Sequence, residues 1–265
     1  MGDIDSWQGL AALAVSIGFS SIRLIGALLV LPLFSNEVMP ALVRNSIFAA
    51  LGVVVAVVRP ADVALGASVG PLLLTIGVEL LLGLSIGLLF GVFLWAFEAA
   101  GELVDTQAGT AQAQVFDPLS GHEVTLYSEF LGRLAHVVFL AAGGLTLVVT
   151  LVLRSFAVWP VGELLPRVRA DGALLFADTF GGVFTLIVLL AAPVLGVLFL
   201  IDMAMGLVNR FAQRLNVFFL SNSIKSLVSV VLLLLMLPIV AETLVRTLDR
   251  NAAETLGLVR SLFGG

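Results

Sequence analysis

Long apolar runs, separated by short polar connections, follow one another along the whole chain. The runs that contain no charged side chain cover residues 6–22, 80–97, 179–201 and 226–241. A helix needs about 17 to 25 mainly apolar residues to cross a lipid bilayer, and these runs approach or reach that length. A membrane barrel would instead show shorter segments in which apolar and polar residues alternate. The pattern therefore predicts an all-α membrane protein.

Prolines and charged turns divide the apolar runs into expected helical hairpins. The first helix is expected from about Trp7 to Phe34, and Pro32 marks its end or a kink near that end. The apolar run from Arg44 to Val58 completes this hairpin. Further apolar segments are expected at residues 63–97, 130–159, 173–205 and 217–245. Because polar positions at membrane depth need protein or water partners, we expect long kinked hairpins, partly buried among other subunits, in one domain that covers residues 1–265.

The first polar interruption covers residues 98–118. Polar and small residues recur there every three or four positions, so on a helix they share one face. The residues of this first stripe are Glu98, Glu102, Asp105, Gly109 and Gln112. No histidine or nucleophile stands in a defined arrangement beside the carboxylates, so acid–base chemistry is not expected. A hydrated helix face is the simpler interpretation.

A second stripe repeats this spacing over residues 202–216. Its members are Asp202, Gly206, Asn209, Gln213 and Asn216. Arg210 and Arg214 lie on the adjacent edge of the same helix. We predict that these arginines compensate carboxylates such as Asp202, either within this chain or across subunits. The candidate subunit contacts are Glu98, Glu102, Asp105, Asp202, Asn209, Arg210, Gln213, Arg214, Asn216 and Lys225.

Three glycines recur at four-residue spacing in the third apolar segment, at Gly83, Gly87 and Gly91. They line one face of the expected helix. In a membrane, a face of small residues lets two helix backbones approach closely. We therefore interpret these glycines as a helix-packing face.

Three ionisable residues fall within apolar segments, namely Arg23, Glu79 and Asp202. Such residues cost about 2.5 to 3.5 kcal/mol on insertion scales, and they often mark functional sites. In a structural role, Arg23 would snorkel or pair with a neighbouring subunit, Glu79 would lie near a wet interface, and Asp202 would contact Arg210. In a functional role, Glu79 and Asp202 would be the coupling carboxylates of a small-solute or ion transporter, although the two halves of the chain show no clear repeat.

Composition narrows the possible functions further. Hydrophobic residues make up 60% of the 265 positions and charged residues 12%, which is too apolar for a soluble domain of this size. The net charge is −5 and the 13 basic residues are scattered, so no nucleic-acid partner is expected. The chain has no cysteine, two histidines and no nucleotide-binding or hydrolase motif, so we expect no metal, no cofactor and no enzyme activity. No basic residue precedes Arg23, so the first apolar run is expected to be retained rather than removed as a signal peptide.

Two polar sequences carry a family resemblance. They are GELVDTQAGTAQAQVFDP at residues 101–118 and NRFAQRLNVFFLSNSIKS at residues 209–226. The first hairpin adds, in matching order, Arg23, Pro32, Phe34, Pro40 and Arg44. With these motifs the chain resembles, over nearly its whole length, the T subunit of the bacterial type III secretion export apparatus, SctT, which is related to flagellar FliR. It departs from that family's pattern at Gln213 and Ser223, where the family commonly has proline.

The resemblance implies an all-helical, non-enzymatic subunit of a helical export gate in the bacterial inner membrane. Its expected partners are the R and S gate subunits, a U subunit that wraps the gate, membrane lipid, and the secreted polypeptides in transit. The subunit would help to form and seal the channel for unfolded secreted proteins.

The same resemblance implies a channel plug in the loop after the first stripe. The plug candidates are Gly109, Thr110, Gln112, Gln114, Val115, Phe116 and Asp117. Several of these side chains are polar, so Val115 and Phe116 would have to supply the apolar part of a seal. Asp117 and Pro118 favour a turn there, and an ordinary re-entrant turn is the alternative interpretation.

Overall fold

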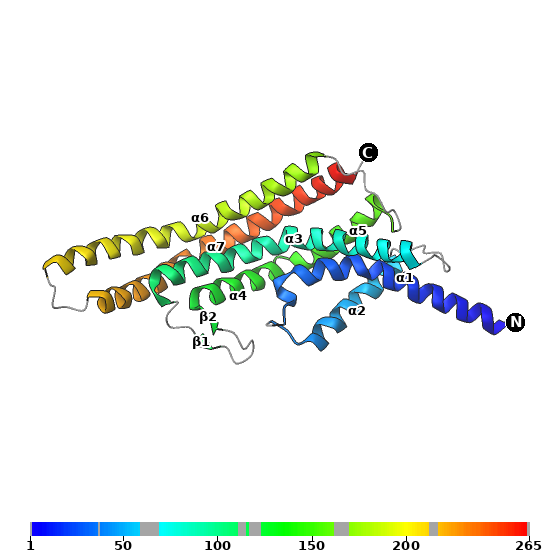
Figure 1. The fold of residues 1–265 in the computed structure, drawn as a ribbon, viewed down its shortest axis with the longest axis horizontal. Coiled ribbons are helices and arrows are strands. Elements are labelled where there is room, and N and C mark those ends of the chain that lie inside the picture. Colours follow the sequence, from blue (N-terminus) through cyan, green and yellow to red (C-terminus); the bar gives the residue numbers. More distant parts are fainter. Residues whose placement is uncertain are drawn as a thin grey trace. The chain divides into compact units, whose positions relative to one another are not determined.

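The computed structural model describes residues 2–36, 38–58, 69–110, 115–116, 123–161, 170–211 and 217–263 (Figure 1). Its elements, in chain order, are α1 (Gly2–Val30), η1 (Pro32–Phe34), α2 (Ala41–Val58), α3 (Val69–Ala108), β1 (Val115–Phe116), β2 (Glu123–Val124), α4 (Leu126–Ala141), α5 (Gly144–Val158), α6 (Ala170–Phe211) and α7 (Val217–Phe263). Within the described residues only β1 and β2 are strands, and each has two residues. The prediction of an all-α protein is confirmed in this sense.

The apolar helices are long enough to cross a bilayer. In the described part of the chain, four segments meet this criterion, at Ala41–Val58, Gly70–Ala108, Ala177–Phe211 and Val217–Arg250. The helix pair α4 and α5 adds a fifth, broken span if the two helices are counted together. Their break lies at Ala142 and at Gly143, whose φ of 80° is in the left-handed region that glycine adopts readily. The membrane prediction is therefore confirmed, and the expected continuous segment 130–159 is in fact two helices.

The polar stripes continue apolar helices instead of separating them. α3 extends through the first stripe as far as Ala108, and α6 extends into the second stripe as far as Phe211. The segment predicted to end at residue 245 continues as α7 to Phe263. Proline does not end α6 or α7, because Pro193 and Pro238 both lie inside these helices. Long helices of this kind tolerate proline where neighbouring groups satisfy the freed backbone carbonyl.

The chain forms two compact units, which are described separately. The first unit comprises Met1–Gly91, Gly143–Asp178 and Asp249–Gly265, and the second comprises Val92–Ala142 and Thr179–Leu248. The helices α3, α6 and α7 contribute residues to both units.

In the first unit, α1 and α2 form the predicted N-terminal hairpin (Figure 1). α1 ends at Val30, just before Pro32, as the proline rule predicts. Arg44 fixes the turn, because its Nη1 donates to the carbonyl oxygen of Phe34 at 3.2 Å and to Oδ1 of Asn36 at 2.7 Å. The rings of Phe34 and Phe48 pack across the hairpin with their centroids 5.3 Å apart.

The packing of α1 against α3 depends on small residues. A Cβ on Gly83 would lie 2.1 Å from the carbonyl oxygen of Arg23, and one on Gly87 would lie 2.1 Å from that of Ala27. At Gly91 the corresponding nearest atom is 3.0 Å away. The backbones of the two helices therefore approach so closely that Gly83 and Gly87 have no room for a side chain.

In the second unit, α6 and α7 run side by side in opposite directions (Figure 1). The segment between α3 and α4 contains the antiparallel pair β1 and β2, in which Val115 is opposite Val124 and Phe116 is opposite Glu123. This unit holds the described residues of both polar stripes. Large apolar side chains on the outer faces of α6 and α7 are exposed, including Phe199, Leu200, Phe219, Leu227 and Leu235.

Candidate functional site

The first unit contains a buried ion pair between Arg23 on α1 and Glu79 on α3. Nε of Arg23 lies 2.8 Å from Oε2 of Glu79, and Nη2 lies 3.0 Å from Oε1, so the contact is bidentate. The two side chains are 0% and 1% exposed. Planar guanidinium and carboxylate groups fit each other in this geometry, which makes it one of the stronger charged contacts in proteins.

The same guanidinium also binds the end of α5. Nη1 of Arg23 donates to Oγ of Ser155 at 2.9 Å, and Nη2 donates to the carbonyl oxygen of Trp159 at 3.0 Å. Its Cζ lies 4.1 Å from the centroid of the Phe156 ring. Arg23 thus links α1, α3 and α5, and the expectations of a snorkelling Arg23 and a wet Glu79 are both wrong. The two side chains meet because each falls on the face that its helix buries.

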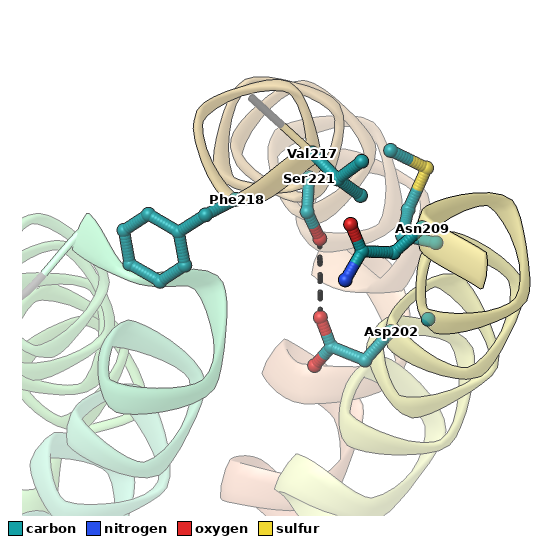
Figure 2. Close-up of a pocket in the computed structure, with 7 residues that line it drawn as sticks. Asp202, Asn209, Val217, Phe218 and Ser221 are labelled. Atoms are coloured by element: carbon teal, nitrogen blue, oxygen red, sulfur yellow. Dashed lines mark hydrogen bonds between the residues drawn. The ribbon is translucent and has the colours of Figure 1, made fainter. Parts of the chain in front are cut away.

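The second unit contains a polar cluster around Asp202 on α6. Nζ of Lys225 lies 3.0 Å from its Oδ1 and 3.3 Å from its Oδ2. Gln107 Nε2 donates to Oδ2 at 3.0 Å. Ser221 Oγ donates to Oδ1 at 3.2 Å, the contact drawn as a dashed line in Figure 2. The cluster therefore joins the end of α3 to α6 and α7, and its carboxylate is balanced by a lysine from the same chain.

The expected contact between Asp202 and Arg210 does not form. Arg210 lies about 12 Å further along the same helix, at 1.5 Å per residue, which is too far for an ion pair with Asp202. Arg210 is exposed at the end of α6 and forms no ion pair within the described part of the chain. Lys225 takes the place that the sequence suggested for the arginine.

A pocket of about 380 Å³ opens beside the Asp202 cluster (Figure 2). It is lined by Asp202, Met205, Gly206, Asn209, Val217, Phe218 and Ser221. Figure 2 shows Ser221 directed at Asp202 and the Asn209 amide near them, while Phe218 points away from both. Asn209 and Ser221 provide hydrogen-bonding groups in this pocket, and the carboxylate of Asp202 is already paired with Lys225. Among the described residues, no three His, Asp or Glu side chains gather as metal ligands.

The carboxylates of the first stripe have three different environments. Glu102 is exposed, whereas the side chain of Glu98 is 36% exposed and its Oε1 lies 3.7 Å from Nε2 of His136. Asp105 is 1% exposed. A single hydrated face is therefore the wrong description of this stripe, because α4 covers the part of it that holds Asp105.

Asp105 is bound by residues that follow it in the chain. Its Oδ1 accepts a hydrogen bond from Oγ1 of Thr110 at 2.6 Å, and its Oδ2 accepts from the backbone N–H groups of Tyr127 and Ser128, both at 2.9 Å. The hydroxyl of Tyr127 lies 2.6 Å from Oγ of Ser229 on α7. Asp105 therefore binds Thr110, which lies within the proposed plug segment, and the first turn of α4, which lies beyond β2.

Several sequence candidates fall outside the described residues, namely Gln112, Gln114, Asp117, Gln213, Arg214 and Asn216. Of the other plug candidates, Gly109 ends α3 with a φ of 78°, Thr110 binds Asp105, and Val115 and Phe116 form β1. The sequence analysis did not identify Ser155, which binds the buried Arg23, or Gln107 and Ser221, which bind Asp202. In the sequence, these residues are distinguished only as polar positions within or next to apolar segments.

Comparison with known proteins identifies the family. Residues 14–250 match the family described as bacterial export proteins, family 1. The chain is 30% identical over 214 residues to Yop proteins translocation protein T of Yersinia pestis, covering 80% of this chain and 82% of the relative. It is 29% identical over 246 residues to secretion system apparatus protein SsaT of Salmonella typhimurium, covering 89% of each chain.

A flagellar protein shows a similar level of identity. The chain is 29% identical over 187 residues to flagellar biosynthetic protein FliR of Bacillus subtilis, which covers 70% of this chain and 72% of the relative. The resemblance to SctT and FliR is thereby confirmed. An apolar helical chain that matches this family from residue 14 to residue 250 belongs to the bacterial export proteins of family 1.

Proposed function

We propose that this chain is a structural and gating subunit of the type III protein secretion export apparatus in the bacterial inner membrane. The observation that carries the proposal is the family match over residues 14–250, together with relatives that are named as translocation and secretion-apparatus proteins. The chain also has helices long and apolar enough to span a bilayer, as a subunit in the inner membrane requires. In this role the subunit helps to form and seal a channel for unfolded polypeptides, and it catalyses no reaction and needs no cofactor.

The partners in this proposal are the R and S gate subunits, the U subunit, membrane lipid and the polypeptides in transit. Support comes from the exposed apolar side chains of α6 and α7, which need lipid or protein to cover them. The exposed residues Asn209 and Arg210 lie at the end of the same apolar helix, α6. A charge at such a position needs a protein or water partner, so we assign Asn209, Arg210 and the neighbouring Gln213, Arg214 and Asn216 to subunit contacts.

We also assign the seal to the segment from Gly109 to Asp117. Support comes from the left-handed turn at Gly109, which ends α3, and from the paired strands β1 and β2 that follow. A short segment is displaced at lower cost than a packed helix, which suits a gate that blocks ions and admits a polypeptide. Deletion of residues 111–114 should raise small-ion leakage across membranes that hold the assembled complex. Unchanged leakage and secretion would leave the segment as a packed turn.

The structure weakens the alternative hypothesis that the chain is a small-solute or ion transporter. It needs Glu79 and Asp202 as carboxylates that exchange a proton or an ion. Glu79 is held on both oxygens by Arg23, and Asp202 is held by Lys225, Gln107 and Ser221. Neither carboxylate is left unpaired for a coupling ion.

Purification of the tagged protein in mild detergent tests the assembly that the proposal requires. We expect two other small hydrophobic subunits to co-purify in constant proportion, and mass spectrometry of the purified complex identifies them. A protein that purifies alone and transports a small solute after reconstitution would contradict the proposal.

A further inference from the structure

We propose that the exposed face of α5 is an interface for a different membrane subunit, and that Arg154 on this face pairs with a carboxylate of that subunit. The inference rests on the proposed place of this chain in a membrane complex, and it names a surface of the first unit and the chemistry of the partner. Three features of α5 support it, namely its fixed orientation, the composition of its exposed face and the charge of Arg154.

The contacts of Arg23 fix which face of α5 is buried. Oγ of Ser155 accepts a hydrogen bond from Nη1 of Arg23 at 2.9 Å, and the carbonyl oxygen of Trp159 accepts one from Nη2 at 3.0 Å. The ring of Phe156 packs on the same guanidinium, with its centroid 4.1 Å from Cζ. Arg154 is one position before Ser155, a rotation of about 100° around the helix. It is therefore exposed, while Ser155 and Phe156 are buried.

The opposite face of α5 carries small and polar residues. Thr146, Arg154 and Ala157 are exposed, and Thr150, which lies between them, is half-buried. These positions recur every three or four residues, so they form one stripe along the helix. The Thr150 hydroxyl donates to the carbonyl oxygen of Thr146 at 2.7 Å, and its oxygen can still accept a hydrogen bond.

This stripe differs from the exposed faces of the other long helices. Large apolar side chains are exposed on α2, α3, α4, α6 and α7, among them Val54, Leu81, Val137, Phe199 and Leu234. Among the described residues, α5 exposes no large apolar side chain. Large apolar side chains are favourable against lipid tails, whereas helix contacts within a membrane are enriched in small residues and hydroxyl groups. The composition of the stripe therefore favours a protein partner over lipid.

Arg154 determines the chemistry of this partner. It lies within the broken span that α4 and α5 form, where an arginine without a counter-charge is costly. It is exposed and forms no ion pair within the described part of the chain. A second copy of this chain that presented the same face would bring two arginines together, which is unfavourable. The guanidinium fits a carboxylate through two parallel hydrogen bonds, so the partner is a different chain whose facing helix carries Asp or Glu.

Co-purification of the complex through a tag on this chain tests the charge. Arg154→Gln should lower the recovery of the facing subunit by about tenfold or more, because the partner's carboxylate would be buried without its counter-charge. Arg154→Lys should retain part of the recovery, since it keeps the charge but loses the bidentate geometry. Arg133→Gln is the matched control, because Arg133 is an exposed arginine of α4 that pairs with Glu129 of its own helix. Its recovery should equal that of the parent.

Two further measurements separate the interface from folding and from lipid binding. The isolated Arg154→Gln chain should melt at the parent temperature in detergent, because Arg154 has no ion-pair partner in the described part of its own chain. A photo-reactive amino acid in place of Thr150 should crosslink to another subunit of the complex, and mass spectrometry should find Asp or Glu in the crosslinked peptide.

Three results would overturn the interface. They are parent-like recovery of every subunit with Arg154→Gln, a lowered melting temperature of that variant alone in detergent, and photo-crosslinks to phospholipid only. A crosslinked peptide without Asp or Glu would overturn the assignment of a carboxylate. Failure of the proposed function would appear differently, because the parent chain itself would then purify without other subunits.

Discussion

The guanidinium of Arg23 is fully buried in an apolar chain, and its environment explains how this is tolerated. A buried charge is costly unless it is paired and its remaining donors are bound. Glu79 binds two of its nitrogens, while Ser155 and the carbonyl oxygen of Trp159 bind further donors. The pair therefore connects three helices of the first unit.

Removal of one member of this pair should be severe. Arg23→Ala leaves Glu79 buried without its counter-charge, and we expect a loss of about 3–5 kcal/mol of stability. Arg133→Ala is the control, since Arg133 pairs with Glu129 at the surface and such pairs contribute about 0–1 kcal/mol. Thermal unfolding of the purified proteins in detergent measures both.

A second variant tests whether the charge itself is responsible. Replacing the whole pair, with Arg23→Met and Glu79→Leu together, should recover much of the stability, because apolar residues of similar size often replace a buried ion pair without loss. A parent-like melting temperature for Arg23→Ala alone would show that the pair is not buried as described.

At the level of single residues, the sequence identifies the ionisable groups within apolar helices, but it does not identify their binding partners. Arg23, Glu79 and Asp202 stand out because each interrupts an apolar run. Their partners do not, since Glu79 lies 56 positions from Arg23 and Trp159 lies 136 positions away. Contacts of this length depend on how the helices pack, which hydrophobic periodicity does not specify.

Among the helix contacts at the described glycines, the backbones of α1 and α3 approach each other most closely. Gly83 and Gly87 lie so close to carbonyl oxygens of α1 that a Cβ at either position would clash with them. The spacing of these glycines suggested a packing face before any partner was known. The partner helix could not be inferred, because every apolar helix in the chain is a suitable neighbour by composition.

Gly83→Ala should therefore destabilise the first unit, by about 1–3 kcal/mol as expected for overpacking. Gly77→Ala is the matched control on the same helix, because a Cβ there has no atom within 4 Å. Alanine has the higher helix propensity, so the control should be neutral or stabilising by up to about 1 kcal/mol. Equal melting temperatures for the two variants in detergent would contradict the close approach of α1 and α3.

The ends of the helices agree with the sequence prediction at some positions and differ from it at others. Pro32 ended the first helix as expected, because proline both restricts the preceding residue and lacks a donor. α3 continues through the first stripe to Ala108 and α6 continues into the second stripe to Phe211, as the three- and four-residue spacing of the stripes predicts. The break at Gly143 was missed, since a glycine pair inside an apolar run is also compatible with a continuous helix.

At the scale of the whole molecule, the apolar composition predicted the class of protein, and motifs within the polar stretches indicated the family. The family match over residues 14–250 confirmed both. The arrangement of the polar residues was less predictable, because one expected stripe is divided among an exposed Glu102, a partly covered Glu98 and a buried Asp105. The buried carboxylates of Glu79 and Asp105 bind groups on neighbouring helices of their own unit.

Secretion by a strain that lacks the gene for this chain is the most direct measurement of its role. We expect the export of type III substrates into the medium to be lost while their synthesis inside the cell continues. A plasmid copy of the parent chain should restore export, whereas the Arg23→Ala copy should restore it poorly, because the first unit depends on the buried pair. Undiminished export in the deletion strain would contradict the assignment of this chain to the export gate.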